Sequence, residues 1–366
     1  MKNTSQAFGG KQVLHDSKTG REIWQMTSGQ FTSHAPYMYN RGFSHDEKYL
    51  VFSSNRSGSF QLYRVEVESG ETWQLTDLED YHNLGLCVDH SGREVYFSAG
   101  NTIWAVEIES GASRLVADFG CLSGGRPIGL CPCLTGDDSL VLIDYIRSDG
   151  AVALAMADAK GSKPEEVFVF PGVERVSHPN FCPGSNDFLT IVVLPDHQDE
   201  KDLPPAYRAR SWKLNLRTRI AEPFLIVPPG FRATHEYWAP DGSKLYFHLK
   251  SVPDWIPASI ASIPRDGGGM KIHFTSETIM LGHSSVNSSQ TKIVSDSQAP
   301  DRNELILIDL ATGGHEVLCW PNASVKKEQT SHVHPAFSPS GKMIVYTSDA
   351  TGWAQVYLIP LDAAQV

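Results

Sequence analysis

The chain has 366 residues, of which 41% are hydrophobic and 10% aromatic, so it is long enough to bury a large core. Its formal net charge of −11 argues against nucleic acid or an anionic membrane surface as a partner. No run of 18 apolar residues predicts a membrane-spanning helix, and segment 1–5 is too polar for an export signal. We therefore expect a cytoplasmic protein whose cysteines are reduced.

Taken in chain order, the first predicted strand is 22–27, which follows a turn at 18–20. It resembles the fourth strand of a repeated unit whose copies occur further along the chain. Each repeat begins with a polar, glycine-containing turn, followed by an alternating apolar strand and further strands. Clear copies start at Phe43, Val88, Trp238 and Phe337, and weaker copies start near Cys131, Phe181 and Val286. The copies follow one another roughly every 40–50 residues, the period of a four-stranded propeller blade.

These copies predict an all-β fold: a single domain over residues 1–366 that forms a seven-bladed β-propeller of four-stranded antiparallel blades. The last copy has only three clear strands, so we expect strand 22–27 to supply its fourth strand and to close the ring. Closure removes the exposed sheet edges that would otherwise promote aggregation. The main irregular insertion is 195–209. Because propellers serve both as interaction platforms and as enzymes, the fold alone does not define the function.

Histidines recur where the innermost strand of a blade is expected to begin. They are His34, His82, His178, His235, His283, His332 and His334. Innermost strands line the central channel of a propeller, so these imidazoles are expected to converge on one mouth of that channel. The alternative is that they cap loops between blades, although each buried imidazole then needs a hydrogen-bond partner.

His332 and His334 are two residues apart on a predicted extended segment, so their side chains should face the same way. The alternative is one core histidine and one loop donor. With His283 from the preceding blade and the amide oxygen of Gln329, they form a set of three nitrogens and one oxygen. Such a set favours a divalent first-row metal with open positions, whereas a structural zinc usually recruits thiolates. Manganese, iron, nickel and catalytic zinc all remain possible at this point.

Several of these segments carry a family resemblance. The phrase Gln-x-x-His-x-His-Pro at 329–335, the phrase His-Glu-Tyr-Trp at 235–238 and the segment 52–58 are among them. Together they resemble the oligogalacturonate lyases, seven-bladed propeller enzymes of intracellular pectin breakdown. The resemblance spans most of the chain. It implies a manganese-type site formed by His283, Gln329, His332 and His334.

The same resemblance implies a catalytic base at His235 and a catalytic arginine at Arg210, with Arg208 as the neighbouring alternative. A uronate lyase removes the weakly acidic C5 proton next to the carboxylate and expels the C4 oxygen. A cation and a guanidinium can stabilise the charge that develops, and a histidine can take the proton near neutral pH. Further substrate contacts are expected from His34, His82, His178 and Arg208.

The sequence thus predicts a metal-dependent lyase that cleaves short oligogalacturonates, such as digalacturonate or its unsaturated form, by β-elimination. Two alternatives remain: a non-catalytic propeller scaffold, and a lyase for a different uronate-containing oligosaccharide. A scaffold needs no ring of histidines and should hold no stoichiometric metal. A peptidase-gating propeller is disfavoured, because no Gly-x-Ser-x-Gly motif is present.

Overall fold

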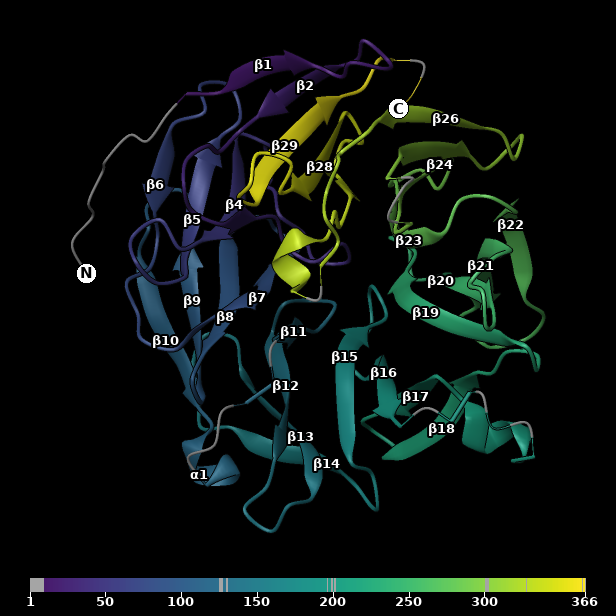
Figure 1. Cartoon of the computed structure of the whole chain (residues 1–366). Helices are drawn as coiled ribbons and strands as arrows, with labels where there is room; N and C mark the ends of the chain where they lie inside the picture. The colour runs from purple at the N-terminus through teal and green to yellow at the C-terminus, as the bar shows by residue number, and fades with distance from the viewer. Residues whose placement is uncertain are drawn as a thin grey trace.

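The structure is a computed structural model that describes residues 10–124, 128–129, 131–195, 197–198, 200, 202–299, 303–326, 328–363 and 365. Within these residues the chain forms seven antiparallel sheets arranged in a ring (Figure 1). Six sheets have four strands and the seventh has five. The predicted seven-bladed all-β propeller is confirmed. In the described part of the chain, no helix is both long and apolar enough to cross a membrane.

The first three complete sheets follow one another along the chain. The first contains β3 (Ser33–His34), β4 (Tyr49–Ser54), β5 (Gln61–Glu66) and β6 (Thr72–Gln74). The second contains β7 (Tyr81–Val88), β8 (Glu94–Ala99), β9 (Thr102–Glu107) and β10 (Ser113–Asp118). After the short helix α1 (Gly120–Ser123), the third contains β11 (Cys133–Leu134), β12 (Leu140–Ile146), β13 (Val152–Asp158) and β14 (Glu165–Phe170).

The next three sheets repeat this order. The fourth contains β15 (Arg175–Phe181), β16 (Phe188–Leu194), β17 (Ser211–Asn215) and β18 (Ile220–Leu225), with the 3-10 helix η1 (Pro205–Arg208) between its second and third strands. The fifth contains β19 (Phe231–Trp238), β20 (Lys244–Ser251), β21 (Ala258–Pro264) and β22 (Lys271–Ser276). The sixth contains β23 (Leu281–Val286), β24 (Lys292–Ser297), β25 (Leu305–Asp309) and β26 (His315–Cys319).

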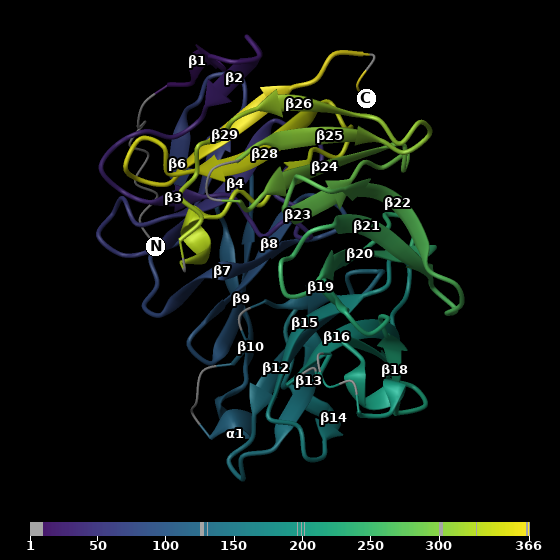
Figure 2. The same cartoon turned by 45° about the vertical axis from the view of Figure 1, so that its right-hand side comes forward.

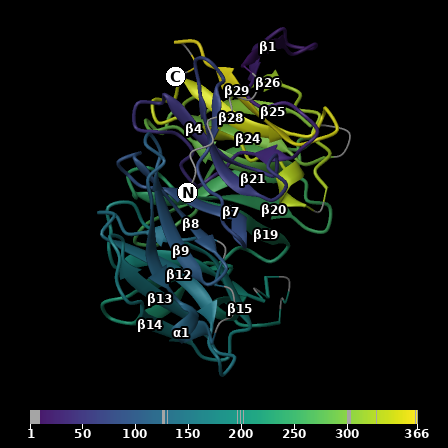
Figure 3. The ribbon, with the colours of Figure 1, turned by 90° about the vertical axis from the view of Figure 1, so that its left-hand side faces the viewer.

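The seventh sheet joins the two ends of the chain. After the 3-10 helix η2 (Gln329–Ser331), it contains β27 (Ala336–Phe337), β28 (Met343–Ser348) and β29 (Gln355–Pro360), followed in the sheet by β2 (Glu22–Gln25) and β1 (Gln12–His15). In all three views the purple N-terminal strands lie next to the yellow C-terminal strands (Figure 1, Figure 2, Figure 3). β2 pairs antiparallel with β29, as the closure prediction requires, whereas β1 is an additional edge strand that was not predicted.

Apolar side chains on the sheet faces pack between neighbouring blades. Phe52 and Tyr63 of the first sheet are stacked with ring centroids 5.7 Å apart, and both are fully buried. They belong to one core cluster with Val345 and Leu358 of the seventh sheet. Burying one such side chain stabilises the fold by about 1.5–3 kcal/mol. This packing joins neighbouring blades, and the first strand of each blade lies towards the centre of the ring (Figure 1).

Candidate metal centre and active site

Three histidines from two neighbouring blades form a cluster at the channel. His283 lies in β23, while His332 and His334 lie between η2 and β27. The ring nitrogens that could bind an ion lie within 4.8 Å of one another. The ring centroid of His283 is 4.3 Å from that of His334 and 5.5 Å from that of His332. The structure therefore brings together the three imidazoles of the predicted metal set.

The backbone of segment 329–334 is not the continuous extended strand that was expected. η2 ends at Ser331, and His334 has a φ of +45°. A left-handed conformation costs a residue other than glycine roughly 1–2 kcal/mol, and such strain is concentrated at functional sites. The two rings share one cluster because of this local turn. The simple alternation of side chains along a strand does not account for it.

Hydrogen bonds orient the three rings. Asp296, only 1% exposed, accepts hydrogen bonds from the backbone N–H of His283 and from its Nδ1 at 3.1 Å, which leaves the Nε2 lone pair available. His332 donates from Nε2 to the carbonyl oxygen of Lys326 at 2.7 Å. A carboxylate or carbonyl on one ring nitrogen fixes the tautomer and presents the other nitrogen to a metal.

Two further observations show that these residues fit a divalent ion. The Nδ1 atom of His332 is buried and has no hydrogen-bond partner among the described residues. The Oε1 atom of Gln329 lies 3.1 Å from Nε2 of His334. Burial, together with repulsion from neighbouring imidazoles, lowers the pKa of His334 well below its usual 6.5. The neutral imidazole is the form that binds metals, so the donor set suits a first-row divalent ion.

The innermost strands carry bulges at the level of the histidines. The strand pairing shifts between Ser177 and Asn180 in β15, and between Thr234 and Tyr237 in β19. The bulges contain His178 with a φ of +55° and His235 with a φ of +57°. A similar shift between Leu281 and Ser284 in β23 surrounds His283. Bulges re-aim side chains and are common next to active sites.

His235 lies against the metal cluster. Its ring centroid is 4.3 Å from that of His283, and its Nδ1 atom is buried without a hydrogen-bond partner in the described part of the chain. Burial lowers the pKa of His235 well below 6.5, and the nearby charges of His283 and Lys250 act in the same direction. The imidazole is therefore neutral at pH 7, as a proton acceptor must be.

A buried ion pair stands beside this histidine. Arg210 donates from Nε to the Oε1 atom of Glu236 at 2.9 Å, and the two side chains are only 16% and 7% exposed. Both residues line a cavity of about 290 Å³, whose wall also includes Tyr37, His178, His235 and Gln329. The structure thus combines the predicted base, the predicted arginine and one predicted metal ligand in a single cavity.

The remaining predicted substrate contacts lie elsewhere. His34 is only 2% exposed, and it packs between the Asn83 amide at 3.2 Å and the Ala35 carbonyl at 3.1 Å. Arg208 is buried at the end of η1, and it is absent from the residues lining the cavity, as is half-buried His82. Of the predicted substrate contacts, only His178 reaches the cavity wall. His34, His82 and Arg208 do not line this cavity, and their contacts with substrate stay predictions.

Three residues of the site received no role from the sequence. Asp296 lies in β24, and a carboxylate in an apolar strand that follows the weaker repeat copy near Val286 could have been suspected to need a partner. Glu236 adjoins the predicted base, which is a weaker signal. Tyr37 stands in a loop without any periodic pattern, so only the three-dimensional structure reveals its position.

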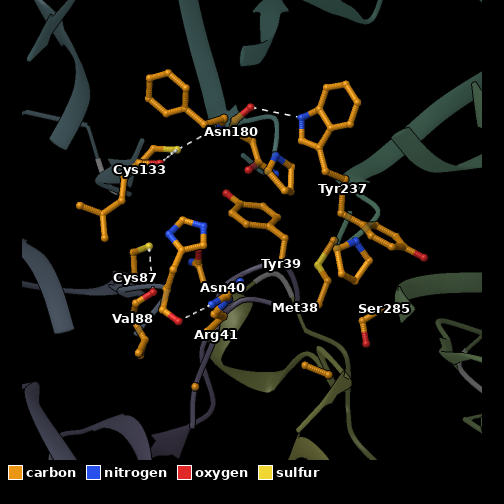
Figure 4. A pocket seen from close by; sticks show the side chains of 18 of the residues that line it. Met38, Tyr39, Asn40, Arg41, Cys87, Val88, Cys133, Asn180, Tyr237 and Ser285 are labelled. Carbon is orange, nitrogen blue, oxygen red and sulfur yellow. Dashed lines mark hydrogen bonds between the residues drawn. The ribbon is translucent and has the colours of Figure 1, made fainter. Parts of the chain in front are cut away.

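A second cavity, of about 360 Å³, lies on the other side of the segment that contains Met38 and Tyr39. Figure 4 shows Tyr39 in the middle of this cavity, surrounded by residues of several blades that include Cys87, Cys133 and Tyr237. Because Met38, Tyr39 and Cys131 line both cavities, this segment forms the wall between them. Gln329 and His235, which neighbour the histidine cluster, line the cavity of about 290 Å³ and not this second one. All six cysteines are free thiols.

Comparison with known proteins identifies relatives over nearly the whole chain, although no family model matches it. An oligogalacturonate lyase of Dickeya dadantii is 23% identical over 94% of this chain and 95% of its own length. An oligogalacturonide lyase of Pectobacterium atrosepticum is 22% identical over the same shares. The chain resembles the oligogalacturonate lyases. This confirms the resemblance predicted from the sequence, and the names of these relatives support the predicted lyase class.

Solved structures show the same fold. A structure of oligogalacturonate lyase in complex with manganese is 18% identical and covers 99% of both chains, with a TM-score of 0.85. The oligogalacturonate lyase of Vibrio parahaemolyticus is 17% identical, covers 99% of this chain and has the same TM-score. These likenesses agree with the seven-bladed architecture described above.

Proposed function

We propose that this chain is a metal-dependent lyase of the cytoplasm that cleaves short oligogalacturonates by β-elimination, with digalacturonate or its 4,5-unsaturated form as substrate. One observation carries the proposal: half-buried His235 lines a cavity with an arginine, and its ring centroid is 4.3 Å from that of His283 in the cluster of three histidines. The lyase names of the full-length relatives support the reaction class.

The metal would be held by His283, His332 and His334, with the amide oxygen of Gln329 as the fourth ligand. We propose Mn²⁺, since a solved oligogalacturonate lyase is a complex with manganese and the donor set suits a first-row ion. When bound, a divalent ion offsets the negative charge of a uronate carboxylate and makes the neighbouring C5 proton more acidic. Proton transfer and binding of the carboxylate are assigned to side chains of the cavity.

His235 is the proposed acceptor of the C5 proton. It is uncharged at neutral pH, and its Nδ1 atom makes no hydrogen bond among the described residues, so a lone pair can be offered to substrate. A well-placed general base contributes about 10²–10⁴-fold in rate. The left-handed backbone of the bulge holds this ring against the cluster and restricts its movement.

Arg210 is the proposed binding group for the uronate carboxylate. Glu236 accepts the Nε–H of Arg210 and thereby fixes the plane of the guanidinium. A fixed guanidinium matches a carboxylate better than a mobile ammonium does. Local positive charge from this arginine and from a metal allows a protein of net charge −11 to bind an acidic sugar. His178, on the same cavity wall, is proposed as a further substrate contact.

The test is to incubate the protein with digalacturonate and Mn²⁺ and to follow the absorbance of the unsaturated uronate product. We expect turnover that a chelator abolishes and that added Mn²⁺ restores. His235→Ala should lower kcat by about 10²–10⁴-fold. The matched control is His90→Ala, because His90 is an exposed histidine paired with Asp138 and does not line the cavity that contains His235. A wild-type protein that binds no stoichiometric metal and yields no product would support a scaffold and overturn the proposal.

A further inference from the structure

Tyr37 occupies the point where three blades meet. Its ring centroid is 4.7 Å from that of His334, 5.7 Å from that of His178 and 5.9 Å from that of His283. These histidines belong to the seventh, fourth and sixth blades. Tyr37 itself follows β3, so it belongs to the first blade. Contacts on this many sides fix the ring in one position.

The hydroxyl of Tyr37 is available for a ligand. Among the described residues no hydrogen bond is formed by this hydroxyl, and half-buried Tyr37 lines the cavity that also contains Arg210 and His235. Buried tyrosines elsewhere in the chain do have hydrogen-bond partners. The hydroxyl of Tyr81 lies 2.8 Å from Ser53, and that of Tyr237 lies 3.0 Å from Ser284. Tyr37 is only partly buried and lines the cavity, so a molecule bound there can supply the hydrogen-bond partner that the fold does not.

The roles already assigned leave the departing C4 oxygen without an interacting residue. The carboxylate is assigned to Arg210 and the metal, and the C5 proton is assigned to His235. When the bond to C4 breaks, the departing oxygen gains negative charge. A donor that is rigid and already in place stabilises such charge most effectively, because it needs no reorganisation. A phenol keeps its proton at neutral pH and is therefore a suitable neutral donor.

We propose that the hydroxyl of Tyr37 donates a hydrogen bond to the C4 oxygen that leaves during elimination. Tyr37 is then a catalytic residue that keeps its own proton and forms no covalent bond. The C5 proton moves to His235, the electron pair of the C5–H bond forms the C4=C5 double bond, and the departing C4 oxygen takes its proton from water. This inference rests on the proposed function, since it assumes a uronate in the cavity. It adds a residue that stabilises the leaving group to a site in which the other side chains act on the carboxylate and on the C5 proton.

The experiment compares Tyr37→Phe with wild type in the full, manganese-loaded chain on digalacturonate. Phenylalanine keeps the ring between the three histidines and removes only the hydroxyl. We expect kcat to fall by about 10²–10³-fold, with a much smaller change in KM, because the hydrogen bond strengthens as charge develops. Tyr81→Phe is the matched control. It removes a buried hydroxyl that already has a partner within the fold, so its kcat should stay near that of wild type.

Calorimetric titration with Mn²⁺ and a thermal unfolding curve accompany the kinetics. Unchanged metal affinity and unfolding temperature in Tyr37→Phe would assign the loss of rate to the hydroxyl. A wild-type kcat in this variant, or a loss explained entirely by weaker Mn²⁺ binding, would overturn the inference and leave the proposed function intact. If wild-type protein gives no product, the proposed function fails, and this inference fails with it.

Discussion

At the scale of single residues, the partner of one ring nitrogen determines what each histidine can do. His283 gives one nitrogen to Asp296 and His332 gives one to a backbone carbonyl, so each retains one nitrogen for a metal. His34 has partners on both nitrogens and is a packed residue. His235 has an unpaired Nδ1 and is suited to take a proton. The same residue type therefore has different roles, which surrounding atoms define.

Asp296→Asn tests this view of orientation. The variant keeps the size of the side chain but weakens its hold on the Nδ1–H of His283, so the ring should be less ordered and less basic. Loss of such a supporting hydrogen bond typically costs about 10–100-fold in metal affinity. Calorimetric titration with Mn²⁺ measures the change. Asp309→Asn, which alters a surface ion pair with Lys292, should bind Mn²⁺ as wild type does. Equal affinities in both variants would contradict the assigned role of Asp296.

At the scale of the elements, register shifts occur in outer strand pairs of several blades as well as in innermost strands, and three of those in innermost strands adjoin the proposed site. The innermost strands of the fourth, fifth and sixth blades shift register beside His178, His235 and His283. A bulge inserts one residue and turns its side chain out of the normal alternation. The edge of the seventh blade is the other special element, because it is assembled from both ends of the chain.

Deletions at the N-terminus test the contribution of β2 to closure. Removing residues 1–15 takes away β1, whose residues are all exposed, and should change the unfolding temperature little. Removing residues 1–25 also takes away β2, including buried Ile23, and leaves the edge of β29 unpaired. Burial of one isoleucine side chain is worth about 1.5–3 kcal/mol, and an open edge promotes association.

We therefore expect the longer deletion to unfold at a clearly lower temperature and to form larger species. Thermal unfolding and light scattering measure the two effects. Similar curves for both deletions would show that β2 does not stabilise the ring.

At the scale of the whole molecule, the ring gathers imidazoles from several blades into one buried region, and this makes stability depend on pH. Burial lowers the pKa of His34 to about 4, and it lowers the pKa values of His235 and His334 well below 6.5. The unfolded chain binds protons near pH 6.5 and the folded chain does not. Stability is therefore complete above that pH and is lost as the pH falls through the window towards 4, by at most about 1.4 kcal/mol per histidine and pH unit.

Urea unfolding at about pH 7 and about pH 5, in the presence of a chelator, measures this dependence. Wild type should be several kcal/mol less stable at the lower pH. His34→Gln removes one titrating group, so its free energy of unfolding should fall less steeply between the two values, whatever its stability at neutral pH. If the two proteins show the same slope, His34 does not contribute to the pH dependence.

The blades, the closure by strand 22–27 and the candidate histidines can all be predicted from local patterns, because turn composition and strand alternation are local properties of the chain. How the side chains meet depends on the three-dimensional fold. It placed Arg210 in the cavity wall without Arg208, packed His34 away from the cavity, and brought Asp296 and Tyr37 to the cluster. The physical reason is that these contacts join residues far apart in the chain, through bulges and left-handed turns that interrupt every local pattern.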